Sequence, residues 1–565
     1  GGASGLGAPD SAESDAEGMD GECLQPCLVV VPASLLGNWM AEVGTWCPHF
    51  KAFQYYSSNQ ADRLGLVDEY FQEHHGRCSL VLTTPGCLNN KTDRAAFFRR
   101  IEFDYLIYDE AHGVKNAGAQ RFKDIYRGLQ VGHRLLLTGT PVQNSLRELG
   151  NLLALLLTQT TETSGSTKSR RGLAHAAVEE LGDLVERGVL RTVQVRAAPF
   201  ILRRLKRDVM KDLPPKTGQT VHCTLTAPQQ LVYNSELAKA RAEAARVGAA
   251  RARKDFVKHL FHRLRRVCNH PLLGQAKLAD TDYEQLVEAL RKVRPDFARA
   301  TPAKALVEVR SWSDYEVASA VRELGLASQL GPKFQVSKEE LLESSAKIQE
   351  LVKLLRAQKE AKRKTLVFSQ FTQFLDLISD VLGSLGIKFA RLDGGTNIGE
   401  RPNIVRNFQD PGSGVDVFLL STKAGGVGLN LTAADSVVLM DLSFNPHDNR
   451  QAEDRVHRLG QSQPVNVHYL VCKSTVEEQV LNINLDKMAL DYKFGGQRML
   501  LQSEQQRLSL QQKPQNGADG RDEEEDDDQE DEEEDEGDTS SMQREAKRAE
   551  QEVLAELERV CSAPA

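Results

Sequence analysis

The chain has 565 residues, of which 40% are hydrophobic and 27% charged, with a formal net charge of −8. At about 150 residues per domain this length predicts three or four units, and the hydrophobic share is enough to build real cores. No apolar run approaches the roughly 18 residues of a membrane-spanning helix, which argues against an integral membrane protein. The nine cysteines are scattered without metal-ligand spacing and indicate a reduced intracellular protein.

The negative charge is concentrated in one segment. Residues 522–538 carry fifteen acids and no base, so the rest of the chain has a net charge of +7. A mildly basic body suits a polyanion such as nucleic acid, whereas a dense acidic tail attracts basic proteins. A merely solvated tail is the alternative. Basic residues also crowd the stretch 239–266, where a nucleic-acid-facing surface and an ordinary solvated helix are equally good interpretations.

The first half of the chain predicts an α/β unit. Residues 1–27 are rich in Gly, Ala, Ser and acids and predict a disordered linker or insertion. Over residues 28–215, short apolar runs alternate with amphipathic stretches, as in buried parallel strands covered by helices. These runs are 28–31, 80–82, 105–108 and 135–137.

The second half repeats this pattern after a helical interruption. The strand signal fades over 216–346, where helix formers dominate, and an α/β pattern returns over 347–500. Residues 501–543 are polar and acidic and predict disorder, and 544–565 predict a short charged helix with a tail. The fold class is therefore α/β, with two parallel-sheet lobes on either side of a helical region. The second set of runs is 365–368, 389–392, 417–420, 437–440 and 465–471.

Polar motifs follow these predicted strands directly. In open parallel sheets ligands bind at the carboxyl ends of the strands, so the shared placement is stronger evidence than any single motif. The motifs are DEAH at 109–112, TGTP at 138–141, SQ at 369–370, DGGT at 393–396 and STKAGG at 421–426.

The DEAH motif places two acids where an apolar strand ends. If the pair is catalytic, Asp109 holds Mg²⁺ largely through water, and Glu110 orients and deprotonates the hydrolytic water. A helix amino-terminus that uses acids to satisfy its dipole is the alternative. The phosphate-cradling loop G-x-x-x-x-G-K-[ST] that accompanies such a pair in nucleoside-triphosphatases occurs nowhere in the sequence.

A second constellation is QAEDRVHRLGQ at 451–461. Arg455 and Arg458 are three apart, so on a helix they project from one face and suit the charge that develops in phosphoryl transfer. A surface helix with ordinary ion pairs is the alternative. Elsewhere, the CNH stretch at 268–270 predicts a helix end rather than a metal site, and core packing best explains Trp39 and Trp46, which are seven residues apart.

In combination, these pieces resemble the Swi/Snf-type ATPases, the chromatin-remodelling branch of the superfamily-two helicase-like proteins. The resemblance covers residues 28–491 and is ordered along the chain. The matching motifs are LVVVPASLLGNW for motif Ia, DEAH for II, LLLTGTPVQN for III, TLVFSQF for IV, STKAGGVGLNLTAAD for V and QAEDRVHRLGQ for VI. Further matches at 199–204 and 268–271 surround the region between the lobes. The stretches WCP at 46–48, YY at 55–56, FRR at 98–100 and SDYE at 313–316 are most similar to the SMARCAD-type subgroup.

This resemblance implies two RecA-like lobes that close over ATP and Mg²⁺ and track along duplex DNA on nucleosomes, in the nucleus. It makes Arg455 and Arg458 arginine fingers, and it implies sequence-independent phosphate contacts with strong salt dependence. The residues implied in ATP binding or coupling are His112, Thr138, Gly139, Thr140, Gly426, Gly428 and Gln451. Those implied in DNA contact are Thr83, Lys115, Ser369, Gln370, Asp393 and Thr422.

The sequence also departs from the family pattern. The phosphate loop and its strand should precede residue 28, and because the chain starts at Gly1 we expect missing upstream sequence rather than a degenerate motor. The chain as written is therefore expected to turn over little ATP. A non-catalytic chromatin scaffold that holds histones with its acidic tail is the second hypothesis. An RNA helicase is disfavoured, because motif III of that class usually reads Ser-Ala-Thr and reads Thr-Gly-Thr here. Pro85 stands where motif Ib of the family usually has an aromatic residue, and Gly113 stands where a basic residue is common.

Overall fold

The computed structural model describes residues 25–111, 129–139, 152–153, 155–156, 198–202, 204, 206–244, 250–397, 399–422 and 428–495. Contacts divide the chain into two compact units, one of residues 1–142 and 146–186 and another of 143–145 and 187–565, and each is described by itself. The predicted linker before residue 25, the acidic segment and the C-terminal helix lie outside the described residues. No helix in the described ranges is long and apolar enough to span a bilayer.

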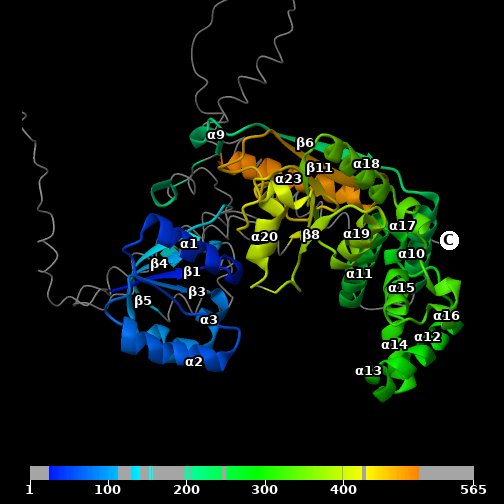
Figure 1. The fold of residues 1–565 in the computed structure, drawn as a ribbon, viewed down its shortest axis with the longest axis horizontal. Coiled ribbons are helices and arrows are strands. Elements are labelled where there is room, and N and C mark those ends of the chain that lie inside the picture. The colour runs from blue at the N-terminus through cyan, green and yellow to red at the C-terminus, as the bar shows by residue number, and fades with distance from the viewer. Residues whose placement is uncertain are drawn as a thin grey trace, which may run out of the picture. The chain divides into compact units, whose positions relative to one another are not determined.

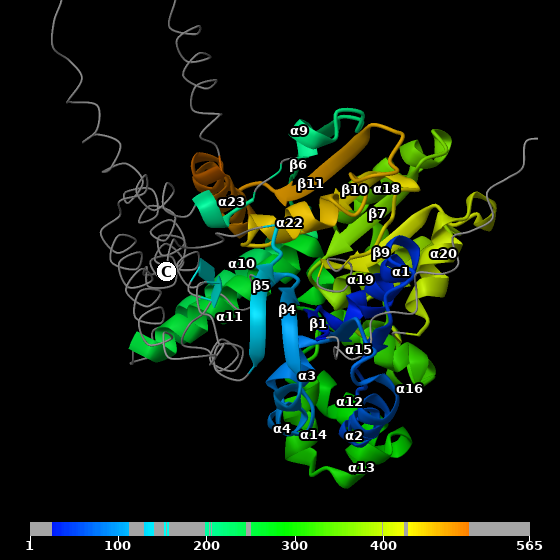
Figure 2. The ribbon, with the colours of Figure 1, turned by 90° about the vertical axis from the view of Figure 1, so that its left-hand side faces the viewer.

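Unit one is a parallel sheet with helices beside it (Figure 1). The strand order is β2-β3-β1-β4-β5, so β1 lies between β3 and β4, and Figure 2 shows β1, β4 and β5 side by side. The strands are β1 (Cys27–Val30), β2 (Ala52–Gln54), β3 (Leu80–Thr83), β4 (Glu102–Tyr108) and β5 (Gln130–Leu136). The helices before β4 are α1 (Leu36–Trp46), α2 (Gln60–Glu69), α3 (Pro85–Asn89) and α4 (Lys91–Ala96).

An aromatic core holds the helices of unit one to its sheet. Tyr55 stacks on Phe97 with ring centroids 4.2 Å apart, and its hydroxyl donates to Asp93 Oδ1 at 3.2 Å. Asp93 is fully buried and also pairs with Arg63 Nε at 2.9 Å. Because a buried charge is tolerated only when it is paired, this ion pair fixes α2 against α4.

Unit two contains the larger sheet. Its order is β6-β11-β10-β7-β9-β8, and every strand pair is parallel. The strands are β6 (Lys216–Cys223), β7 (Lys364–Ser369), β8 (Phe389–Leu392), β9 (Val417–Ser421), β10 (Ala434–Leu439) and β11 (Val465–Cys472). The helices associated with it are α18 (Ala346–Glu360), α19 (Thr372–Ser384), α20 (Arg401–Gln409), α22 (Pro446–Glu453) and α23 (Val476–Gly495).

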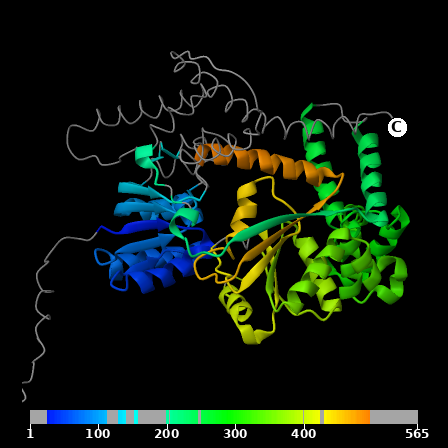
Figure 3. The same ribbon diagram turned by 90° about the horizontal axis from the view of Figure 1, so that it is seen from above.

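The region between the two sheets in sequence is largely helical and belongs to unit two. Figure 3 shows its green helices beside the sheet of this unit. Helices α10 and α11 share a hydrophobic core with the sheet, whereas α12 to α16 enclose a separate core around Leu286, Phe297 and Val321. The helices are α9 (Lys206–Val209), α10 (Ala227–Ala244), α11 (Ala250–Asn269), α12 (Asp280–Val293), α13 (Pro295–Arg299), α14 (Pro302–Val309), α15 (Asp314–Glu323), α16 (Ala327–Leu330) and α17 (Lys338–Glu343).

The α/β fold class with two parallel-sheet lobes is confirmed, and each of the nine predicted apolar runs overlaps an observed strand. The region 216–346 was expected to be helical, but it begins with a strand. This strand, β6, pairs with β11 along its whole length. Its side chains are mostly exposed, as suits the edge of a sheet, and so it lacks the apolar run of a buried strand. The domain boundaries themselves stay a prediction.

The predicted helix end at 268–270 is confirmed. Helix α11 ends at Asn269, and His270 caps the short turn that follows. Its Nδ1 accepts from the Leu272 backbone N–H at 3.1 Å, and Nε2 lies 3.2 Å from the Leu341 carbonyl oxygen. This pattern requires a neutral ring with its proton on Nε2. Burial lowers the pKa of His270 to about 4.

The buried neutral His270 predicts a loss of stability in mild acid. In the unfolded chain His270 has a pKa of 6.5 and is protonated below that pH, whereas in the folded protein it stays neutral down to about pH 4. The free energy of unfolding therefore falls as pH falls from 6.5 to 4. Between pH 7 and pH 5 the free energy of unfolding should drop by about 2 kcal/mol more in the wild type than in His270→Asn. Urea unfolding at both pH values measures this difference, and an equal pH dependence in the two proteins would contradict it.

Candidate functional site

The acidic pair lies in a turn fixed between two strand ends. The Asp109 backbone N–H donates to the Val30 carbonyl at the end of β1, and the Ala111 N–H donates to the Leu137 carbonyl just after β5, both at 2.9 Å. The turn therefore lies at the carboxyl edge of the sheet, where ligands bind in open parallel sheets. Glu110 has a φ of +52°, a left-handed conformation that is uncommon outside glycine and concentrates at functional sites.

Two donors orient the Asp109 carboxylate. Oδ1 accepts the Glu110 backbone N–H at 2.9 Å, and Oδ2 accepts Trp39 Nε1 at 3.1 Å. The prediction that Trp39 and Trp46 are core residues was wrong. Trp46 is 78% exposed, and Trp39 is half-buried with its indole N–H on Asp109. The indole N–H needs a hydrogen-bond acceptor, which favours the rim of the site over the core. Trp39 was missed although it ends the motif Ia stretch.

Motif III lies beside the acidic turn. The Leu137 N–H donates to the Tyr108 carbonyl at 2.9 Å, so Thr138 and Gly139 follow β5 at the same edge as Asp109. Thr83, in contrast, is fully buried, and its hydroxyl donates to the Tyr55 carbonyl at 2.9 Å. The Thr83 side chain therefore completes the sheet, and a contact of this residue with DNA stays a prediction. The predicted residues His112, Lys115 and Thr140 lie outside the described residues.

In unit two, motifs V and VI are bound to each other. The Leu431 N–H donates to the Arg455 carbonyl at 3.1 Å, and Arg458 Nη1 donates to the Leu429 carbonyl at 3.2 Å. The preceding Gly428 has a φ of +64°, which favours glycine. One arginine of the predicted pair thus holds the turn that begins at Gly428. Gly426 lies outside the described residues.

The helical placement of the two arginines was wrong. Helix α22 ends at Glu453, so Arg455 and Arg458 lie in the turns that follow, and Arg455 Nε reaches back to the Gln451 carbonyl at 3.0 Å. The two acids of the same stretch pair with lysines. Glu453 pairs with Lys216 at 2.7 Å, and Asp454 pairs with Lys206 at 2.7 Å.

The predicted DNA residues of unit two divide into buried and rim positions. Ser369 is fully buried and Thr422 is 8% exposed, so neither side chain forms an open surface. Ser369 Oγ donates to Asp441 Oδ2 at 2.5 Å, and the Gln370 backbone N–H donates to Asp441 Oδ1 at 3.0 Å. The sequence reading missed Asp441, although it follows β10 as the other motifs follow their strands.

Asp393 shapes its own turn. Its Oδ2 accepts Arg391 Nε at 2.8 Å, and Oδ1 accepts the Gly395 N–H at 2.9 Å. Burial acts to raise the pKa of Asp393, but the hydrogen bonds from Arg391 and Gly395 hold that pKa below its ordinary value. An ionised carboxylate repels phosphate, so Asp393 is better suited to holding the turn than to binding DNA directly.

The residues of unit one fit a magnesium ion. Mg²⁺ prefers oxygen ligands and keeps several of its waters, so one half-buried carboxylate at the open edge of a sheet is a suitable donor. Asp109 is such a carboxylate, with Glu110 next to it in the turn. The acidic pair belongs to one unit and the arginine pair to the other.

The ion pair of Glu453 predicts a measurable contribution to stability. Glu453 is 95% buried and accepts from Lys216 Nζ and from the Tyr469 hydroxyl at 2.8 Å. Lys216→Met leaves this charge half-paired and should lower the free energy of unfolding by about 2 kcal/mol. Adding Glu453→Gln should restore at least half of the loss, because no buried charge then remains. Urea unfolding of the Lys216→Met variant and of the double variant measures both effects. A Lys216→Met variant as stable as the wild type would contradict the prediction.

Comparisons with known proteins identify the family of this chain. The SNF2-related domain matches residues 10–273, and the helicase conserved C-terminal domain matches 346–460. The Xenopus tropicalis SWI/SNF-related matrix-associated actin-dependent regulator of chromatin subfamily A containing DEAD/H box 1 is 34% identical over 472 residues. This alignment covers 82% of the chain and 45% of that protein.

The ATP-dependent helicase fft2 of Schizosaccharomyces pombe is 36% identical over 484 residues, which cover 82% of the chain and 36% of that protein. The chain thus spans less than half the length of these two relatives. The crystal structure of the C-terminal part of the Fun30 ATPase domain matches with 33% identity and a TM-score of 0.43, over 48% of the chain and 89% of that structure. The predicted family and subgroup are confirmed: the chain belongs to the SNF2-related, helicase-like family and is a homologue of its DEAD/H-box-1 chromatin regulators.

Proposed function

We propose that this chain is the motor region of an ATP-dependent DNA translocase of the chromatin-remodelling type, which couples ATP hydrolysis to movement along duplex DNA on nucleosomes in the nucleus. The observation that carries the proposal is that the candidate catalytic and binding residues lie in turns that follow the strands. Unit one has an acid pair beside Thr138 and Gly139. In unit two the Arg458 side chain donates to the turn that begins at Gly428, and the Arg455 carbonyl accepts the Leu431 N–H. Relatives of this chain are named as a chromatin regulator and an ATP-dependent helicase.

The roles proposed for the site residues follow from their chemistry. Bound magnesium would neutralise phosphate charge, and Asp109 would hold it. Glu110, whose backbone is left-handed, would orient and deprotonate the attacking water. Arg455 and Arg458 would stabilise the charge that develops on the transferred phosphoryl group. Both arginines are half-buried, which makes them more effective than fully hydrated charges.

Other residues would bind the nucleotide or couple it to DNA. We propose Gln451 and Gly428 for nucleotide binding, because Arg455 donates to the Gln451 carbonyl and Arg458 donates to the carbonyl of Leu429, the residue after Gly428. Thr138 and Gly139 would link the acid pair to DNA. For the remaining predicted residues the sequence pattern alone supports the same roles, which are ATP binding for His112, Thr140 and Gly426 and DNA contact for Lys115.

Because the 565 residues contain no phosphate-cradling loop, DNA binding tests the proposal on the chain as it stands. The chain should bind duplex DNA of unrelated sequences with similar affinity, since phosphate contacts carry no sequence information. Its affinity should fall at least about ten-fold between 50 and 200 mM salt, because each neutralised phosphate releases counterions. Fluorescence anisotropy with two labelled duplexes measures this, and binding that is absent or insensitive to salt would contradict the proposal.

The acidic segment suggests that the nucleosome is engaged through histones as well. Residues 522–538 carry fifteen acids, and dense negative charge attracts basic proteins. A chain ending at Gly520 should therefore capture fewer histones than the full chain while binding duplex DNA at least as well. If histone capture were the whole function, the chain would be a scaffold and would fail the DNA measurement.

A further inference from the structure

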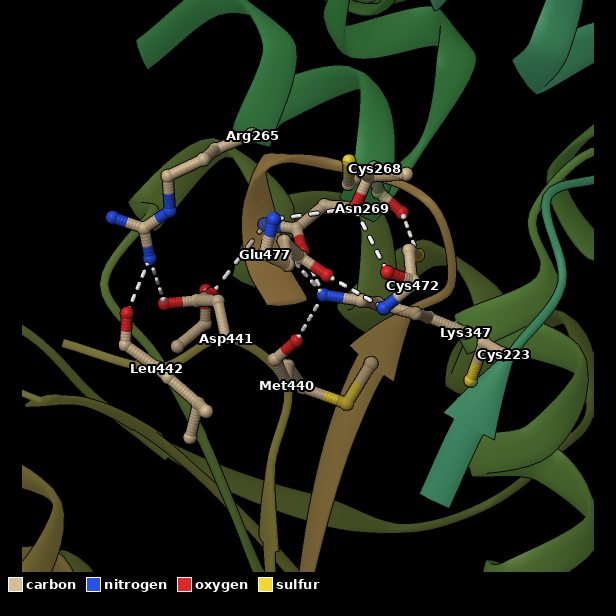
Figure 4. Close-up of polar contacts among 12 residues, drawn as sticks. Cys223, Arg265, Cys268, Asn269, Lys347, Met440, Asp441, Leu442, Cys472 and Glu477 are labelled. Carbon is tan, nitrogen blue, oxygen red and sulfur yellow. Dashed lines mark hydrogen bonds and ion pairs between the residues drawn. The ribbon is translucent and has the colours of Figure 1, made fainter. Parts of the chain in front are cut away.

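Figure 4 shows a buried polar network in unit two. Through Asp441 this network is hydrogen-bonded to the loop of residues 369–371. Its centre is Asp441, which follows β10 and whose side chain has no exposed surface. Besides Ser369 and Gln370, the carboxylate has two neighbours on α11: Asn269 Nδ2 at 3.4 Å and Arg265 Nη2 at 3.9 Å. Four groups from two segments therefore meet on one buried charge.

We propose that Asp441 is a positioning residue that holds the 369–371 loop in the conformation that meets the DNA backbone, and that Lys347 is the buried cation that keeps this network in register. The inference rests on the proposed function for its DNA step, but the positioning step is independent of it.

Both oxygens of Asp441 are committed to this loop. Oδ2 accepts a hydrogen bond from the Ser369 hydroxyl, and Oδ1 accepts one from the Gln370 N–H. The Phe371 N–H in turn donates to Ser369 Oγ at 3.1 Å. Hydrogen bonds to a carboxylate are roughly twice as strong as neutral ones, so the charge defines the path of three consecutive residues. The Phe371 ring is held from α11, with the Arg265 guanidinium 5.4 Å from its centroid.

Lys347 fixes the second layer of the network. Its Nζ is fully buried and donates to Asn269 Oδ1 at 2.9 Å, the Met440 carbonyl at 2.6 Å and Glu477 Oε1 at 2.7 Å. These contacts use all three protons of the ammonium group. Because Oδ1 of Asn269 faces the ammonium, its Nδ2 must face Asp441, so the cation decides the orientation of the amide.

Glu477 completes the neutralisation. Its other oxygen, Oε2, accepts the Cys472 backbone N–H at 2.9 Å. Burial acts to lower the pKa of Lys347, but Glu477, together with Cys472, Asp441 and Cys268, outweighs burial and raises that pKa, so the ammonium stays charged. The donor atoms of Cys268, Cys472 and Glu477 lie within 4.8 Å of one another, a spacing that also suits a metal ion. Here Lys347 supplies the positive charge at Glu477, and the Cys472 thiol donates to the Cys268 carbonyl at 3.4 Å.

The network joins elements that are far apart in the sequence. Asn269 and Arg265 come from α11, Lys347 from α18 and Glu477 from α23, while Asp441 follows β10. The loop is thus set by the helical region as well as by its own lobe. A preset loop loses little conformational freedom when a ligand arrives, which favours binding. Gln370 Nε2 is buried and has no hydrogen-bond partner among the described residues, so the loop retains an unused donor.

The test compares two aspartates of the same segment in the full chain. Asp441→Asn keeps the shape but removes the charge and one of the two acceptors that the loop requires. Asp435→Asn is the matched control. Asp435 is 8% exposed, pairs with Arg363 at 3.0 Å, and lies six residues upstream, about 20 Å away along the strand direction.

We expect Asp441→Asn to speed hydrogen exchange at the Gln370 and Phe371 amides and to lower duplex DNA affinity by about ten-fold, with a salt slope reduced by about one. Asp435→Asn should leave the loop amides and the affinity unchanged. If Asp441→Asn does not fold, Ser369→Ala removes only the bridging hydroxyl and should give the same changes to a smaller extent.

Two results would overturn the inference. One is loop exchange in Asp441→Asn or Ser369→Ala that matches the wild type, which removes the positioning role. The other is faster loop exchange with wild-type DNA affinity and salt slope, which removes the connection to DNA. A wild-type chain that binds no duplex DNA would instead contradict the proposed function, and the exchange measurement would still decide whether Asp441 holds the loop.

Discussion

Parallel strand pairing is the constraint on which both units of this protein depend. Parallel strands all end at the same edge of the sheet, so residues far apart in sequence are brought together there without direct contact along the chain. In unit one this places Asp109 beside Thr138, and in unit two it places Ser369 beside Asp441. Short turns are therefore enough to bring the candidate functional residues together, because the parallel sheets align the strand ends that carry them.

Buried charge then adds precision to this alignment. Asp93, Glu453, Glu477 and Asp441 are all nearly or fully buried, and each has a cation partner. Such pairs contribute little net stability compared with apolar packing, but breaking one leaves an unpaired charge at a high cost. Two of them belong to or contact predicted functional segments: Glu453 lies within motif VI, and Asp441 is hydrogen-bonded to the 369–371 loop. In both cases the charge restricts where the functional backbone can lie.

The sequence predicted the sheets better than it predicted the turns. Buried parallel strands appear as apolar runs, so β1, β7 and β10 could be located directly. The edge strand β6 is largely exposed, and β2 has only three residues, so neither produces such a run. Spacing placed Arg455 and Arg458 on one helix, but α22 ends before them, and no periodicity in the sequence marks that end. Thr83 and Ser369 occupy the expected strand ends, yet a polar residue at a strand end can equally face inward, which a motif does not reveal.

The central proposal is that this chain is the motor region of a DNA-dependent, ATP-hydrolysing protein. It is tested most directly by ATP hydrolysis with and without duplex DNA, in a protein in which a segment carrying a phosphate-binding loop has been joined ahead of this chain, next to its Glu110→Gln variant. The account predicts that duplex DNA stimulates hydrolysis and that the variant loses at least about a hundred-fold of it, as removal of a general base does. Hydrolysis that ignores DNA, or that survives in the variant, would contradict it.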